Sequence, residues 1–154
     1  DYAPPPPYDT MFDPGYTGTV TGSDFLRNKG IHRGMPARDL EHLIALYDGE
    51  IRYTDEHLGR IVEHLARLGV LDDTVVIVTA DHGDEFFEHG RRGHEPRLYD
   101  ELVRVPFVLR FPPRVPAGQV VTRQVRLADI ADSWRFFRMV DPISNCRISC
   151  VICC

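Results

Sequence analysis

A continuous run of β-branched residues that follows a long amphipathic segment is the feature that most constrains this fold. The run Val75-Val76-Ile77-Val78 has no polar alternation, which indicates a strand buried on both faces. Upstream, apolar residues recur at steps of three and four from Leu40 to Leu68, which predicts one apolar helical face. A helix that leads into a buried strand is typical of an α/β sheet with parallel strands. We therefore predict an α/β fold.

The ends of the predicted helix are marked by proline and glycine. Pro36 is a good first helical position, and Gly69 is the expected C-cap. Gly49 and Gly59 weaken the helix locally, so one long helix and two shorter ones are both consistent with the pattern.

The remaining segments carry weaker signals. Prolines 4–7 favour an extended polyproline conformation, so residues 1–16 are interpreted as a surface arm, and the glycines of residues 17–34 predict loop with at most a short turn of helix. Residues 102–111 form a second strand candidate, in which Pro106 indicates a late start, a bend or an edge position. Residues 120–127 are predicted as a short strand, and residues 128–131 as the start of a helix.

Charge and hydrophobicity exclude two classes of partner. The net charge of -5 argues against nucleic acid, because phosphate binding needs clustered lysine and arginine. We also predict no membrane segment, because no run approaches the roughly 20 apolar residues that span a bilayer.

The candidate chemistry lies in the polar stretch 79–85 (TADHGDE), just past the carboxyl end of the buried strand. In open α/β sheets, sites form at that end. Asp81 offers a carboxylate and His82 an imidazole nitrogen, both usual metal ligands, and Gly83 lets the backbone turn away sharply. A solvated acidic loop with a capping aspartate is equally consistent with these three residues alone.

More polar residues lie further along the same loop. His94 is a candidate for a second positive or hydrogen-bonding group near the pocket. A metal ion with such a donor suits an anionic ester, whose oxygens need neutralising in the transition state. His89 is interpreted as loop-ordering or exposed. Two alternatives stay open for the acidic residues of this loop, supporting the site or plain surface charge: Asp84, Glu85 and Glu88. Arg91 and Arg92 either contact substrate or belong to a solvated loop.

The stretch 77–90 (IVTADHGDEFFEHG) resembles the second metal-ligand motif of the sulfatases, a family of the alkaline phosphatase superfamily. Gly93-His94 and residues 98–107 (LYDELVRVPF) are similar to the segment after that motif in the family. Residues 45–59 (ALYDGEIRYTDEHLG) resemble the helix before it, and residues 1–5 resemble a mid-domain loop of many bacterial members. The resemblance covers about residues 1–132.

This resemblance implies an alkaline-phosphatase-like mixed sheet flanked by helices, and hydrolysis of a sulfate ester on a small molecule or glycan. Asp81 and His82 would be ligands of a divalent ion, usually Ca²⁺ in the family, with Mn²⁺ or Zn²⁺ as alternatives. His94 would take the place of the basic residue, often lysine, that contacts the sulfate or the leaving-group oxygen. The nucleophile in the family is a formylglycine made from the Cys or Ser of a Cys/Ser-x-Pro-x-Arg motif.

Two parts of that active site have no counterpart in the sequence. No Cys/Ser-x-Pro-x-Arg motif occurs, and the acidic ligands that the family carries upstream would lie before Asp1. Residues 1–132 are therefore expected to be a partial catalytic domain whose N-terminal strands are missing, and a fragment that is inactive alone.

Residues 133–154 depart from the family pattern. All four cysteines lie there, at positions 146, 150, 153 and 154, and their spacing fits no two-pair zinc pattern. We interpret this tail as a shifted reading frame or foreign end rather than as a small zinc or redox site.

These observations support three hypotheses. The first is a fragment of a metal-dependent sulfuric ester hydrolase. The second keeps the fold but changes the ester, giving a phosphodiester or phosphonate monoester hydrolase. The third is a non-catalytic remnant, whether an unfolded piece or a weak metal-binding module.

Overall fold

The computed structural model of the 154-residue chain describes residues 1–130 and the backbone of residues 147–153. It divides the chain into two compact units. The first comprises Asp1–Ile61 and His82–Val105, and the second comprises Val62–Asp81 and Pro106–Cys154. Much of the tail that departs from the family pattern, including Cys146 and Cys154, lies outside the described residues.

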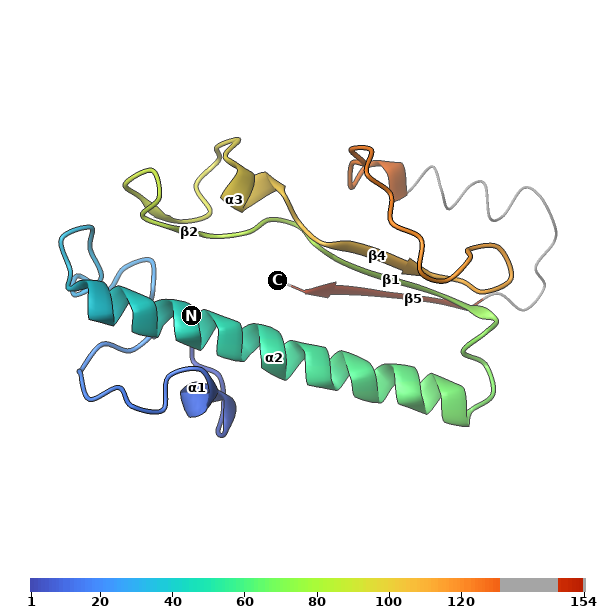
Figure 1. The fold of residues 1–154 in the computed structure, drawn as a ribbon, viewed down its shortest axis with the longest axis horizontal. Helices are drawn as coiled ribbons and strands as arrows, with labels where there is room; N and C mark the ends of the chain where they lie inside the picture. The colour runs from blue at the N-terminus through green and yellow to red at the C-terminus, as the bar shows by residue number, and fades with distance from the viewer. Residues whose placement is uncertain (131–146, 154) are drawn as a thin grey trace. The chain divides into compact units, whose positions relative to one another are not determined.

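The second unit contains a mixed sheet of three strands in the order β4-β1-β5, seen side by side in Figure 1. The central strand β1 (Thr74–Ala80) pairs in parallel with β5 (Arg147–Cys153) and antiparallel with β4 (Phe107–Arg110). The predicted parallel pairing is thus present on one side of β1. Strand β5 itself was not predicted from the sequence.

The predicted burial of β1 is confirmed. Val75 is 1% exposed, and its neighbours Val76 and Ile77 are also buried, so side chains on both faces of the strand are covered. Val75 and Ile77 pack with Phe111 in a core cluster of this unit. Strand β4 begins directly after Pro106, which confirms the late start that the proline predicts.

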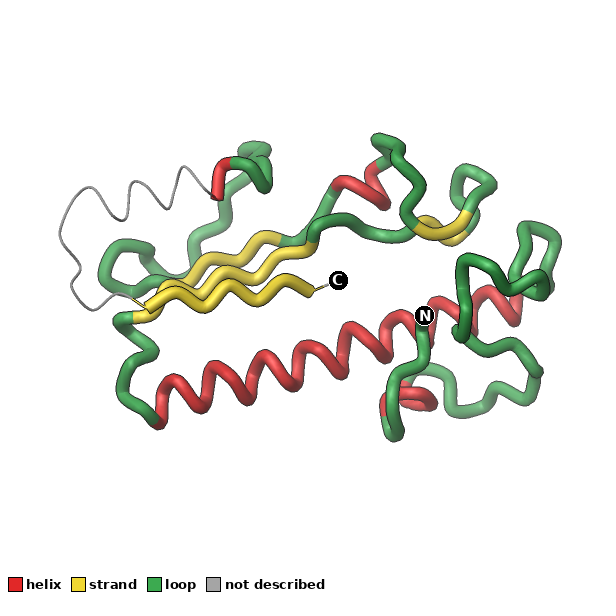
Figure 2. The backbone as a smooth tube through the Cα atoms, turned by 180° about the vertical axis from the view of Figure 1, so that it is seen from behind, coloured by secondary structure: helices red, strands yellow, loops and turns green. Residues whose placement is uncertain are grey.

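Helix α2 (Ala37–Arg67) is one continuous helix of 31 residues, so the two glycines inside it do not interrupt it (Figure 2). Gly49 has a packing role: a Cβ atom at this position would lie 2.5 Å from the backbone oxygen of Tyr8. None of the helices in the described part of the chain is long and apolar enough to cross a membrane.

The predicted C-cap at Gly69 is confirmed by its backbone geometry. Gly69 has φ +70°, in the left-handed region that glycine adopts without strain. The Val70 N–H donates to the carbonyl of Leu65 at 3.1 Å, and the Gly69 N–H donates to that of Ala66 at 2.9 Å. These two bonds form the Schellman motif that ends many helices.

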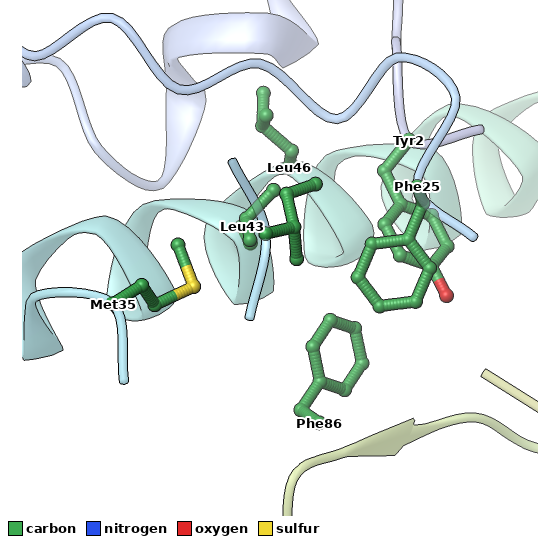
Figure 3. Packing of buried hydrophobic residues seen from close by; sticks show 7 residues of the cluster. Tyr2, Phe25, Met35, Leu43, Leu46 and Phe86 are labelled. Atoms are coloured by element: carbon green, nitrogen blue, oxygen red, sulfur yellow. The ribbon is translucent and has the colours of Figure 1, made fainter. Parts of the chain in front are cut away.

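The core of the first unit gathers around the start of α2 and is shown in Figure 3. Leu43 and Leu46 of α2 pack in one cluster with the aromatic rings of Tyr2, Phe25 and Phe86. The ring centroids of Tyr2 and Phe25 are 4.6 Å apart, and those of Tyr2 and Phe86 are 5.6 Å apart.

The interpretation of residues 1–16 as a surface arm is wrong. Tyr2 is only 7% exposed, and Pro4 and Tyr8 are buried as well, although the prolines at positions 5–7 are exposed. Proline content predicts backbone conformation but not burial, and the aromatic side chains around it are drawn into the core. The short helix α1 (Tyr8–Met11) follows the prolines.

The weaker predictions had mixed outcomes. Residues 17–34 form loop and turns, as predicted. The strand predicted at 120–127 is absent: Val120 and Val121 are 87% and 69% exposed, and the segment joins no described strand. The helix start predicted at 128–131 is confirmed as far as the structure describes it: Asp129 and Ile130 are helical, and their N–H groups donate to the carbonyls of Arg126 and Leu127.

Candidate active site

The loop that follows β1 contains a glycine whose position leaves no room for a Cβ atom. The Gly83 N–H donates to the carbonyl of Leu102 at 2.9 Å, in the short helix α3 (Asp100–Val103). A Cβ atom on Gly83 would stand 2.0 Å from the backbone oxygen of Glu101, where no real Cβ fits. Close backbone approach, rather than an unusual φ, therefore requires glycine at this position.

The residues on either side of this glycine belong to a group of potential metal ligands in the first unit. His82, Asp84 and His94 each offer a nitrogen or oxygen atom, and these atoms all lie within 4.8 Å of one another. His94 Nδ1 is 3.0 Å from Asp84 Oδ1. The imidazole rings of His82 and His94 are stacked, with centroids 4.1 Å apart and planes inclined by 23°.

Asp84 has a second partner from the distant start of the chain. The Tyr2 hydroxyl donates a short hydrogen bond to Asp84 Oδ2. Burial raises the pKa of Tyr2 well above its usual range, and the hydrogen bond to Asp84 raises it further. Burial also raises the pKa of the Tyr47 phenol, with a smaller contribution from the charge of Asp84. Tyr2 therefore stays protonated and remains a donor to the carboxylate.

Asp81 lies outside this three-residue group. It ends the first stretch of the second unit, its side chain is exposed, and it precedes His82 directly in the chain. Of the three residues singled out by the resemblance, the structure thus brings His82 and His94 together and adds Asp84.

The loop that carries His94 is held in shape by Glu85 and by the hairpin of β2 (Glu85–Phe86) and β3 (Arg92–Gly93). Glu85 is 2% exposed, and its Oε1 accepts hydrogen bonds of 2.9 Å from the backbone N–H groups of His89 and Arg91. Among the roles left open for Glu85, that of surface charge is wrong. Its buried carboxylate instead accepts hydrogen bonds from the backbone N–H groups of the turn.

The other polar residues of the loop have local partners. The Glu88 carboxylate accepts a hydrogen bond from the Phe86 N–H at 2.5 Å. The His89 ring stacks on Tyr99 with centroids 3.6 Å apart, as expected for a loop-ordering residue. Arg91 Nη1 forms an ion pair with Glu95 Oε2 at 2.5 Å.

Arg92 joins the hairpin to the preceding loop. Its guanidinium donates to the carbonyl oxygens of Leu26 and Asn28, at 2.8 and 2.9 Å, and by a short bond to that of Ile31. This arginine therefore has a structural role. No sequence pattern indicated it, because its acceptors are backbone atoms more than 60 residues away.

A cavity of about 560 Å³ opens beside His94. Its polar lining includes His32, Arg33, Arg91 and Glu95, and its apolar lining includes Ile31 and Phe87. A second, smaller cavity of about 180 Å³ is lined by Tyr2, Asp84 and His94 among others. His94 thus borders both cavities, and ligand sites commonly occupy volumes of about 300–1,000 Å³.

The donor set of the three-residue group fits a divalent metal ion. Two imidazoles and one carboxylate are ligands that Mn²⁺ and Zn²⁺ accept readily, whereas Ca²⁺ prefers oxygen.

A solved structure defines the class of fold. The chain is similar to a phosphonate monoester hydrolase from Silicibacter pomeroyi, with a TM-score of 0.57 and 28% identity, over 76% of this chain and 27% of that one. The predicted alkaline-phosphatase-like architecture, present in part, is thereby confirmed.

Sequence comparison then defines the family. The sulfatase family model matches residues 2–135, and the chain belongs to the sulfatase family. The N-acetylglucosamine-6-O-sulfatase of Bacteroides thetaiotaomicron is 30% identical over 100 residues, which is 64% of this chain and 18% of that protein. Arylsulfatase K of Canis lupus familiaris is 33% identical over 93 residues, 60% of this chain and 17% of that protein. The chain thus spans less than a fifth of the length of these relatives.

Proposed function

We propose that this chain carries one part of the active site of a divalent-metal-dependent sulfuric ester hydrolase. The observation that carries the proposal is the grouping of His82, Asp84 and His94 beside a cavity bordered by arginines. A metal ligand and a hydrogen-bond donor beside a cationic cavity suit an ester with negatively charged oxygens. Residues 1–132 would belong to the catalytic domain and residues 133–154 would not.

In this proposal Asp81 and His82 hold the metal. A bound divalent ion would neutralise charge on the ester oxygens as a Lewis acid. Ca²⁺ is the first candidate because of the family, and Mn²⁺ or Zn²⁺ are alternatives that the imidazole of His82 favours. The Cys/Ser-x-Pro-x-Arg nucleophile motif does not occur in these 154 residues, so the nucleophile would come from a segment outside them.

His94 would donate a hydrogen bond to the sulfate or to the leaving-group oxygen. Asp84 Oδ1 accepts from Nδ1 of His94, which leaves Nε2 as the nitrogen for the substrate. Tyr2 holds the other oxygen of Asp84 and so limits rotation of the carboxylate. Asp84 is therefore a positioning residue for His94, in the way that a carboxylate orients histidine in many hydrolases.

A phosphonate monoester or phosphodiester hydrolase is the second candidate. The likeness to the Silicibacter pomeroyi enzyme favours it, because that protein is named for phosphonate monoesters. Sulfate and phosphate esters present similar oxygens to a metal and a histidine, so the described residues suit both.

Metal binding tests the proposal. Isothermal titration of the full chain with Ca²⁺, Mn²⁺ and Zn²⁺ is expected to show saturable binding of at least one ion. His82→Gln and Asp81→Asn should each weaken this binding by about tenfold or more. His64→Gln, on an exposed position of α2, is the matched control and should bind as the wild type does.

Two results would count against the proposal. Equal affinities in the wild type and in both variants would show that the ion binds elsewhere. A chain that shows no cooperative unfolding with or without metal would favour the non-catalytic remnant. With the metal-loaded chain, tighter binding of phenyl phosphate than of phenyl sulfate would favour the second candidate.

A further inference from the structure

We infer that the larger cavity beside His94 is a subsite for a second anionic group on the substrate, a carboxylate or a further sulfate, held mainly by Arg33. This inference rests on the proposed function, since it places the cleaved ester at His94. It adds a substrate class: esters that carry two negative charges on one skeleton.

The charges around the cavity are unbalanced. Three arginines, at positions 33, 91 and 92, line it against a single carboxylate, that of Glu95. This excess stands out because the chain as a whole has a net charge of -5. A concave surface of one sign concentrates ligands of the other sign.

The three arginines differ in what they can offer to a ligand. Arg91 is neutralised by Glu95 at 2.5 Å, and the Arg92 guanidinium is occupied by backbone carbonyls. Arg33 is exposed and has no hydrogen bond or ion pair with any residue that the structure describes. Its donors are thus available, and a guanidinium binds carboxylate or sulfate through two parallel hydrogen bonds.

The chain next to Arg33 is fixed by its packing and hydrogen bonds, and these bonds do not use the Arg33 guanidinium. Its neighbour Ile31 is 2% exposed in the core, and the Ile31 carbonyl accepts from Arg92. On the other side, Arg33 Nη1 would be 3.6 Å from a Cβ on Gly90, so the guanidinium lies against the turn that leads to His94. Fixing the residues before Arg33 lowers the entropy that binding would otherwise cost.

His32 lines the cavity next to Arg33. Its Nδ1 accepts from the Gly34 N–H at 3.1 Å, which leaves Nε2 as a donor toward a ligand. Ile31 and Phe87 give the cavity apolar surface for the carbon skeleton. The volume of about 560 Å³ accommodates more than one sulfate group.

A pair of probes that differ only in the second charge tests the inference. Phenyl sulfate and 4-carboxyphenyl sulfate are titrated into the full chain, with Mn²⁺ and separately with EDTA, and followed by ¹H–¹⁵N NMR shifts. The two-charge probe is expected to bind about tenfold more tightly than phenyl sulfate. Arg33→Gln should reduce this ratio to about twofold or less.

Lys29→Gln is the matched control, because it removes a positive charge from the same loop without lining the cavity. It should keep the preference for the two-charge probe. An equal loss in both variants, or no preference in the wild type, would overturn the inference. So would inorganic sulfate binding as tightly as the two-charge probe, since this would indicate a site for free anions.

The two proposals fail in different ways. Phenyl sulfate binding that is unaffected by Mn²⁺ and by His82→Gln contradicts the proposed function. The ratio between the two probes in EDTA still decides whether Arg33 recognises the second charge.

Discussion

Asp84 connects two residues that lie far apart in the sequence. One carboxylate oxygen accepts from Tyr2, which is 82 residues away, and the other lies 3.0 Å from His94 Nδ1. The pattern of residues 79–85 indicated where such a site would form, but it left Asp84 undecided between site and surface. A tyrosine at position 2 cannot be linked to it without the fold.

Replacing Tyr2 by phenylalanine tests this connection. The ring keeps its place in the core, while Asp84 loses a donor in a partly buried position. We expect the free energy of unfolding to fall by roughly 1.5–3 kcal/mol, as for hydrogen bonds to charged groups. Urea unfolding followed by circular dichroism measures it.

Tyr53→Phe is the control for this change, because the Tyr53 hydroxyl has no hydrogen-bond partner among the described residues. Its effect should stay within about 0.5 kcal/mol. Equal effects of the two substitutions would mean that the Tyr2 hydroxyl contributes nothing specific.

The elements that were predicted correctly are those whose signal lies within the element. Helix α2 and strand β1 follow from the spacing of their own apolar residues, and the cap at Gly69 follows from one residue type at one place. The strand expected at 120–127 failed because a strand needs a partner, and alternation alone does not supply one. The roles of Tyr2 and Arg33 could not be predicted from the sequence for a related reason. The residues near them in the fold come from distant segments of the chain.

Two glycines give a matched test at the level of elements. Gly83→Ala would bring a Cβ to 2.0 Å from the Glu101 oxygen, so the loop must shift away from α3. We expect lower stability together with weaker metal binding. Gly59→Ala lies inside α2, where a Cβ would meet nothing within 4 Å beyond the helix's own backbone, and it should stabilise the helix by roughly 0.5–1 kcal/mol.

Thermal melting and metal titration on both variants check this pair. Metal affinity should be unchanged in Gly59→Ala. A Gly83→Ala variant with wild-type melting and affinity would show that the approach of Glu101 is not needed for the site.

At the scale of the whole molecule, stability should depend on acid through carboxylates that the fold holds charged. Hydrogen bonds from Arg38 lower the pKa of Asp13 below its usual value of 3.8, and the bond to His42 also lowers it. The Tyr8 and Arg60 side chains lower the pKa of Glu56 below 4.5. A carboxyl whose pKa is lower in the folded state stabilises the fold above its usual pKa.

This contribution is lost as the pH falls through the folded-state pKa values, below about 4. Asp13→Asn should therefore melt at a lower temperature than the wild type at pH 7, and the difference should shrink toward pH 2. Melting curves across this range measure it. A difference between the two proteins that is constant with pH would contradict the role assigned to the Asp13 charge.

The hydrogen bonds from Arg92 to the carbonyls of Leu26, Asn28 and Ile31 have a consequence for local opening of the folded protein. Arg92 joins the loop that carries His94 to the segment that carries Arg33. Neither segment can therefore move far from its place while the other stays folded. Local fluctuations would expose both together, as one cooperative unit of hydrogen exchange. Any ligand that touches either segment would slow the exchange of both.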